Sequence, residues 1–391
     1  MNKTKLTIMA FLISGVVLSG CSSGSDQSSA SAEKVQEPTQ TEEVKELTSD
    51  EEDEKFYFTA DEGGSITKIS ASTNEVVETI QVDGVVHNVQ VSPDGKMLGA
   101  TVIPMNTGEA GHETETHGND SHGDHGEDPH GEAAPESDGH GHGDGTPGQA
   151  MFFNIETDEL IESVPIGNHP AHFVFTEDGK YALVTNNEDD NVSVIDMESM
   201  NVTAEIATGK GPHGFRISSD SEKAYIANMN EDSVSVIDLV TMKEEKKITV
   251  GAAPVTTGIT SDGKTLVVTL NAENSLAIVD LEKDQIEKVE VGHGPAQVYI
   301  DGNDQFAYVA NQGTADAPSA SVTVIDLAAK KAAATIPTGK GAHGAVTSSD
   351  SKFLYVTNMF DHTVTVIDTE EQKAIETIEV GKVPNGISIM K

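Results

Sequence analysis

A strand-like segment that ends in aspartate recurs about every 42 residues over the second half of the chain. Its copies occupy residues 191–196, 233–238, 275–280, 321–326 and 363–368. Each copy is rich in β-branched residues, and a second strand-like segment precedes it by about ten residues, as at 182–186. Because one such unit cannot bury its apolar face alone, the units must pack against one another around a shared core.

The repeat predicts an all-β fold, a seven-bladed β-propeller with four short strands in each blade. Six blades begin near Val86, Pro170, Pro212, Pro254, Pro295 and Ala342. The seventh is split: residues 56–80 supply three strands, and residues 386–390 supply the innermost one. The C-terminal strand therefore joins the N-terminal blade and closes the ring, which leaves no free sheet edge.

One copy of the second strand reads Tyr355-Val-Thr-Asn358, which resembles the motif that names the YVTN family of β-propellers. The resemblance extends over roughly residues 56–391 apart from one insertion, and it implies the propeller fold. It does not imply one activity, because propellers host lactonases, quinoprotein and haem enzymes, adhesins and metal carriers.

The N-terminus resembles the export signal and lipobox of a bacterial lipoprotein. Residues 1–20 combine early lysines with a short apolar run, and Leu18-Ser-Gly-Cys21 follows. We expect Cys21 to be lipidated, with residues 21–55 as a disordered acidic, Ser-rich tether and an extracytoplasmic, membrane-anchored location. An ordinary signal peptide with a chance cysteine is the alternative. Cys21 is the only cysteine, which excludes disulfides and a Cys-x-x-Cys-His haem site.

The charge balance is strongly acidic, with a formal net charge of −41. Such a chain repels nucleic acid and anionic headgroups and attracts cations, so no nucleic-acid partner is expected. Solubility, or adaptation to a salty habitat, explains the same charge without a functional role.

A His-rich insertion interrupts the second blade at residues 106–148, within the propeller domain 56–391. Its histidines are His112, His117, His122, His125, His130, His140 and His142. The segment has no apolar periodicity, so we expect a mobile loop. Imidazole mixed with carboxylate suits Zn(II), with Cu(II) and Ni(II) as the alternatives. A polar low-complexity expansion with incidental metal affinity is the other interpretation.

The remaining histidines gather by position in the predicted ring. His87, His213 and His343 occupy equivalent places where an innermost strand begins, and His172 lies one residue further along. His169 and His293 lie in connections between blades. The inter-blade connections and the loops between second and third strands share one face of a four-strand meander. The His-rich insertion and the acidic loops at 188–190, 231–232, 273 and 361 therefore also belong to that face.

We interpret His87, His172 and His213, from consecutive blades, as the primary ligand set for a zinc ion. The set would be completed by His343, His169, His293 or a loop carboxylate. The alternative is that each histidine is a hydrogen-bonded structural residue of its turn.

This layout resembles the extracytoplasmic zinc metallochaperones of the YVTN type, which pass zinc to the solute-binding protein of an ABC importer. The resemblance implies that the loop collects zinc and the channel-mouth histidines hold it for transfer. A lactonase-like hydrolase is the competing enzyme class, although the inner positions offer no recurrent acid. An adhesion or scaffold protein is the third interpretation.

Overall fold

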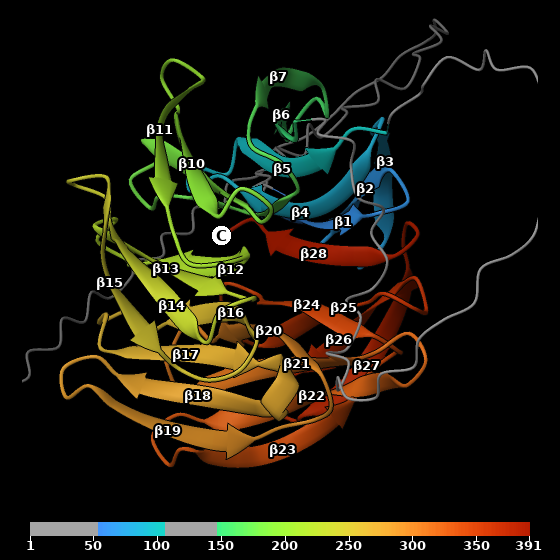
Figure 1. The fold of residues 1–391 in the computed structure, drawn as a ribbon. Coiled ribbons are helices and arrows are strands. Elements are labelled where there is room, and N and C mark those ends of the chain that lie inside the picture. Colours follow the sequence, from blue (N-terminus) through green and yellow to red (C-terminus); the bar gives the residue numbers. More distant parts are fainter. Residues whose placement is uncertain (1–53, 106–146) are drawn as a thin grey trace, which may run out of the picture. The chain divides into compact units, whose positions relative to one another are not determined.

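The chain forms a ring of seven four-stranded antiparallel sheets, described for residues 54–105 and 147–391 of a computed structural model. Figure 1 shows the sheets arranged around a central axis. The innermost strands of neighbouring sheets contact one another in a closed cycle, which completes the ring. The sequence-based prediction of a seven-bladed all-β propeller is therefore confirmed.

The blades are numbered here in chain order. Blade 1 contains β28 (Pro384–Ile389), β1 (Phe56–Asp61), β2 (Ser65–Ser70) and β3 (Val76–Gln81). Blade 2 contains β4 (Val85–Val91), β5 (Met97–Ile103), β6 (Gln149–Asn154) and β7 (Leu160–Pro165). Blade 3 contains β8 (Pro170–Phe175), β9 (Tyr181–Asn186), β10 (Asn191–Asp196) and β11 (Asn201–Ala207). Blade 4 contains β12 (Pro212–Ile217), β13 (Lys223–Asn228), β14 (Ser233–Asp238) and β15 (Lys243–Thr249).

Blade 5 contains β16 (Pro254–Ile259), β17 (Thr265–Leu270), β18 (Ser275–Asp280) and β19 (Gln285–Glu290), with a short 3-10 turn η1 (Asn271–Glu273) before β18. Blade 6 contains β20 (Pro295–Ile300), β21 (Phe306–Gly313), β22 (Pro318–Asp326) and β23 (Lys331–Pro337). Blade 7 contains β24 (Ala342–Thr347), β25 (Phe353–Asn358), β26 (Thr363–Asp368) and β27 (Lys373–Glu379). The expected signal segment, most of the tether with Cys21, and the seven insertion histidines lie outside the described residues.

Ring closure uses β28 as predicted. This strand pairs antiparallel with β1, with Tyr57 opposite Ile389 and Thr59 opposite Ile387. It begins two residues earlier than the expected segment 386–390, at Pro384. The C-terminus therefore lies among the innermost strands (Figure 1).

Apolar layers between adjacent blades hold the ring together. Phe58 of blade 1 packs in one cluster with Val89 and Leu98 of blade 2. On the other side of blade 1, the rings of Tyr57 and Tyr355 approach to 4.3 Å between centroids. Because the inner three strands are covered on both faces by such layers, they are buried along most of their length.

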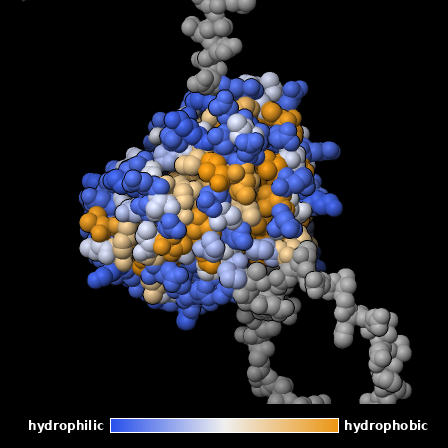
Figure 2. Space-filling view, turned by 90° about the horizontal axis from the view of Figure 1, so that it is seen from above, coloured by the Kyte–Doolittle hydropathy of each residue, from blue (hydrophilic) through white to orange (hydrophobic). Residues whose placement is uncertain are grey.

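The outermost strand of each blade faces solvent, and in several blades its exposure alternates along the strand, as in β11. Seen from above, the surface is largely hydrophilic with smaller hydrophobic areas between (Figure 2). No helix in residues 54–105 and 147–391 has both the length and the apolar character needed to cross a bilayer.

Candidate metal centre

Three imidazoles from consecutive innermost strands meet at the start of those strands. His87 is on β4, His172 on β8 and His213 on β12. Their ring centroids are 6.2 Å apart for His87 and His172, 5.6 Å for His87 and His213, and 5.0 Å for His172 and His213. One ring nitrogen of each residue lies within 4.8 Å of the other two. We call these three residues the tri-histidine cluster.

A β-bulge positions each member of the cluster. The pairing of β4 with β5 shifts register between Val86 and Asn88, at His87. The pairing of β8 with β9 shifts between Pro170 and Phe173, and β12 shifts at the equivalent place. A bulge sets two successive residues against one partner and redirects their side chains. This explains how His172 reaches the cluster although it lies one position further along its strand.

Buried threonines fix the spacing between neighbouring strands of the cluster. The Thr185 hydroxyl accepts a hydrogen bond from the backbone N–H of His172 (3.0 Å) and donates one to the carbonyl of His213 (2.7 Å). Thr101 makes the same pair of bonds between blades 2 and 3. Each hydroxyl thus bonds two adjacent blades, and the imidazoles are held by a rigid framework rather than by loops.

Hydrogen-bond partners at Nδ1 orient the rings of His87 and His213. His87 Nδ1 lies 3.0 Å from Glu62 Oε1, and the Glu62 side chain is only 9% exposed. The Asn385 amide donates to the same Glu62 oxygen at 2.7 Å. Because an ionised carboxylate can only accept, the contact with Glu62 places the His87 proton on Nδ1. His213 Nδ1 lies 3.2 Å from the carbonyl of Val255, which can only accept. With the proton on Nδ1 in both rings, the lone pair is on Nε2.

Burial keeps two imidazoles of the cluster, those of His172 and His213, neutral. Burial, with smaller contributions from His213 and His87, holds the pKa of His172 well below its usual 6.5. Burial followed by His87 and His343 lowers the pKa of His213 to about 3. His172 is 1% exposed, and its Nε2 is buried with no hydrogen-bond partner within the described residues. Neutral imidazoles with a buried, unsatisfied nitrogen are suited to bind a metal cation.

The other predicted histidines lie outside this cluster. The His343 side chain is buried on β24, with Nδ1 3.3 Å from the carbonyl of Asn385. His169 lies beside Glu188, with 3.6 Å between Nδ1 and Oε1. His293 is exposed and lies next to Asn274. His343 is on blade 7, which blade 1 separates from blade 2, and it is not among the three histidines whose ring nitrogens lie within 4.8 Å of one another.

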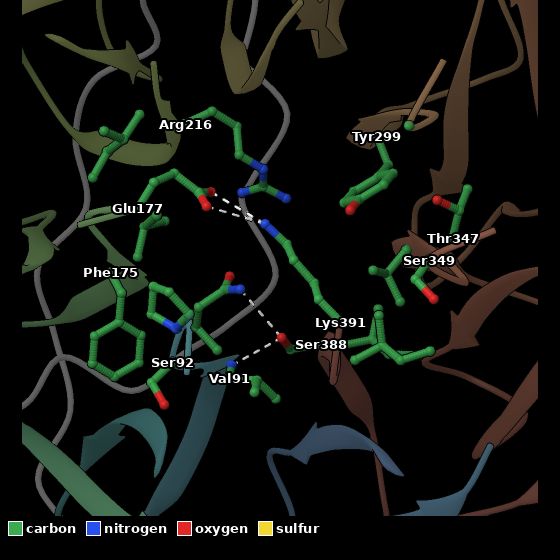
Figure 3. A pocket seen from close by; sticks show the side chains of 18 of the residues that line it. Val91, Ser92, Phe175, Glu177, Arg216, Tyr299, Thr347, Ser349, Ser388 and Lys391 are labelled. Carbon is green, nitrogen blue, oxygen red and sulfur yellow. Dashed lines mark hydrogen bonds and ion pairs between the residues drawn. The ribbon is translucent and has the colours of Figure 1, made fainter. Parts of the chain in front are cut away.

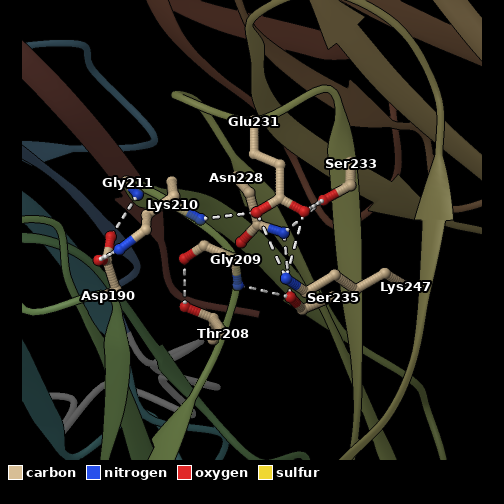
Figure 4. A network of polar contacts seen from close by, with 10 residues as sticks. All are labelled: Asp190, Thr208, Gly209, Lys210, Gly211, Asn228, Glu231, Ser233, Ser235 and Lys247. Carbon is tan, nitrogen blue, oxygen red and sulfur yellow. Dashed lines mark hydrogen bonds and ion pairs between the residues drawn. The ribbon is translucent and has the colours of Figure 1, made fainter.

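Several of the acidic loops that we expected on this face bind the inter-blade connections. Figure 4 shows the connection between blades 3 and 4. The Gly211 N–H donates to Asp190 (2.9 Å), and the Lys210 N–H donates to Glu231 (3.1 Å). The hydrogen bond from Lys210 Nζ lowers the pKa of Asp190. These carboxylates support the connections that lead into the innermost strands, rather than adding ligands to the cluster.

Glu62 is a residue of the site that no sequence pattern had indicated. This residue follows β1, in the turn between the second and third strands of blade 1. The topological rule that assigned residues 188–190 and 231–232 to the histidine face applies equally to this turn. The split of blade 1 between the two ends of the repeat region concealed that equivalence.

Comparisons with known proteins support the fold. A family model described as YNCE-like beta-propeller matches residues 163–304, which include His172 and His213 but not His87. No curated protein matches. Among solved structures, Kuenenia stuttgartiensis hydrazine synthase aligns with a TM-score of 0.60 and 20% identity, over 78% of this chain and 89% of that chain. That likeness shows the fold alone, and function must be argued from the site.

Proposed function

We propose that this protein binds a divalent metal outside the cytoplasm as a zinc metallochaperone. The tri-histidine cluster carries the proposal, because it joins three imidazoles, two of them kept neutral by burial, in a preorganised arrangement. Zinc is here the cargo, and Cu(II) and Ni(II) are the alternative metals because imidazole binds all three.

The dimensions of the cluster suit one zinc ion. Tetrahedral ligands with Zn–N bonds of roughly 2.0–2.1 Å lie about 3.3 Å apart. The three nitrogens already lie within 4.8 Å of one another, so side-chain shifts on the order of 1 Å close the set around one ion. The Glu62–His87 pair matches the carboxylate–histidine partner that commonly supports zinc-bound imidazole.

Three protein ligands leave the fourth zinc position open. A water or a donor group from another protein can enter there, so zinc can be passed on by ligand exchange. We therefore propose the solute-binding protein of a metal ABC importer as recipient, with the lipid anchor at Cys21 confining delivery to the membrane. The acidic chain and the insertion histidines would raise the local cation concentration.

A hydrolase is the second candidate, because an open three-histidine zinc is also a catalytic arrangement. The closest carboxylate described at the cluster, Glu62, bonds His87 and Asn385 and is not positioned as a general base. Hydrolysis of lactone and ester substrates by the zinc-loaded protein, lost on changing the cluster, would favour this function over transfer.

Zinc titration by calorimetry against a competing chelator tests the proposal. We expect one tight site in the untagged wild-type protein and several weaker ones. Changing His87, His172 and His213 together to Ala should abolish the tight site, whereas changing the exposed His293 to Ala should not. Deleting residues 109–145 should lower the number of zinc ions bound per protein and leave one tightly bound zinc.

Two outcomes would overturn the assignment. A triple variant that keeps the tight zinc, with its fold verified by circular dichroism, would place the site elsewhere. A wild-type protein without any tight site would remove the chaperone function, and an adhesion or scaffold role would then be the better account.

A further inference from the structure

The only arginine of the chain, Arg216, lies in the central channel at the mouth opposite the tri-histidine cluster. It belongs to β12 and lines a cavity of about 330 Å³, formed where the innermost strands end and their turns begin. Ser92, Glu177 and Ser349, from turns of three different blades, line the same cavity. Figure 3 shows the guanidinium of Arg216 extending into this space, with Tyr299 on the other side.

The Arg216 guanidinium forms no ion pair with a carboxylate in the described part of the chain. Its Nη1 donates to the carbonyl of Phe215 (2.9 Å), and its Cζ lies 6.0 Å from the centre of the Tyr299 ring. Burial lowers the pKa of this guanidinium, but an arginine still keeps its charge at neutral pH. In a chain with 65 acidic residues, a half-buried arginine without a carboxylate is unexpected, because such charges are normally paired.

The one carboxylate side chain that lines this cavity, Glu177, is already paired. Both oxygens of Glu177 lie within 3.3 Å of Lys391 Nζ, as Figure 3 also shows. Among the side chains that line this cavity, Arg216 is therefore the cation that no carboxylate of the described residues pairs.

The walls determine what kind of anion fits. Tyr299, Thr347 and Ser349, which carry hydroxyl groups, line the side of the cavity across from Arg216. Apolar side chains form the rest of the wall, among them Phe175 and Val346. A guanidinium offers two parallel N–H donors that match a carboxylate, and the apolar walls favour an organic body over water. The volume is near the lower limit for small-molecule sites, roughly 300 Å³.

We propose that this channel mouth binds a small organic monocarboxylate, with its carboxylate on Arg216 and its apolar body against the surrounding side chains. The site is independent of the proposed metal function, since it involves other residues at the other end of the innermost strands. The negative net charge of the chain does not prevent an anion from binding here at physiological salt, because charges more than about 8 Å away are then largely screened.

Benzoate is the probe, and benzamide is its uncharged control of the same shape. We expect benzoate to raise the unfolding temperature of the zinc-free full chain saturably in 150 mM salt, and benzamide to have no effect. Arg216→Gln should abolish the shift. Arg216→Lys should weaken binding at least tenfold because it retains charge without the paired donors. Lys352→Gln, at an exposed lysine, should change nothing.

The wild-type comparison decides the question even if the Arg216 variants fail to fold. Equal responses to benzoate and benzamide, or none to either, would overturn the proposal. So would a response of Arg216→Gln equal to that of the wild type. Stabilisation by inorganic phosphate stronger than that by benzoate would also overturn it, since it would indicate a general oxyanion site.

Discussion

Asp61 provides a test of how burial controls ionisation in this ring. It ends β1 and is fully buried, and hydroxyls of Ser65 and Thr67 donate to its Oδ2 at 3.0 and 2.7 Å. Burial nevertheless raises its pKa from 3.8 to about 6. Other blades carry a neutral amide at the equivalent position: Asn186, Asn228, Asn311 and Asn358. Asp61→Asn is thus a change of similar shape that removes the charge.

The magnitude follows from the two pKa values. Between pH 3.8 and about 6 the folded protein holds a proton that the unfolded chain has lost. The stability from this group is therefore fully present below pH 3.8 and is lost as the pH rises through 6. The difference between the unfolded pKa of 3.8 and the folded pKa of about 6 corresponds to about 3 kcal/mol of unfolding free energy. About 2 kcal/mol of this is lost between pH 4.5 and 7.5.

Urea unfolding of the wild type and Asp61→Asn at pH 4.5 and 7.5 measures this effect. We expect the advantage of the asparagine variant to grow by about 2 kcal/mol between the two pH values. Asp196→Asn is the control with the opposite sign. The Asp196 carboxylate accepts hydrogen bonds from Ser199, which lower its pKa, so removing its charge should cost stability at neutral pH. If the variant Asp61→Asn and the wild type differ in unfolding free energy by the same amount at both pH values, the argument from burial is refuted.

Glu62→Gln should weaken zinc binding about 10–100-fold, because the carboxylate that orients His87 loses its charge. Glu188→Gln should leave the zinc affinity unchanged. If the two variants bind zinc equally well, Glu62 has only a packing role. Cys21→Ser should move the protein from the membrane to the soluble fraction, and continued sedimentation with membranes would indicate another anchor. Deleting residues 384–391 should cost at least about 5 kcal/mol of unfolding free energy, since β28 and its buried isoleucines are lost. If the shortened chain has the same unfolding free energy as the intact chain, β28 does not stabilise the ring as we expect.

Local patterns were sufficient to predict the ring. Period-two runs and Asp-Gly turns depend on near neighbours in the sequence, so the strand order and the blade starts at Pro170 and Pro212 could be read directly. The missing innermost strand of the N-terminal blade required the C-terminal one to replace it, and β28 pairs with β1.

The site depended on geometry that no local pattern contains. His343 is equivalent by repeat to His87 and His213, yet the cluster contains His172 instead. Distances across the channel depend on how many blades lie between two residues, and a bulge determines which of two successive side chains points inward.

The sequence by itself determined which side chains were available: one arginine, fourteen histidines, and strands in units of four. Only the tertiary structure decided which of them meet. Glu62 contacts His87 because blades 1 and 2 pack against each other, and ring closure by β28 brings Asn385 to the same carboxylate. The turns of several blades converge around Arg216, and within the described residues none of them gives it a carboxylate partner. The contact between Asn385 and Glu62 joins residues far apart in the chain, and it arises only when the ring has closed.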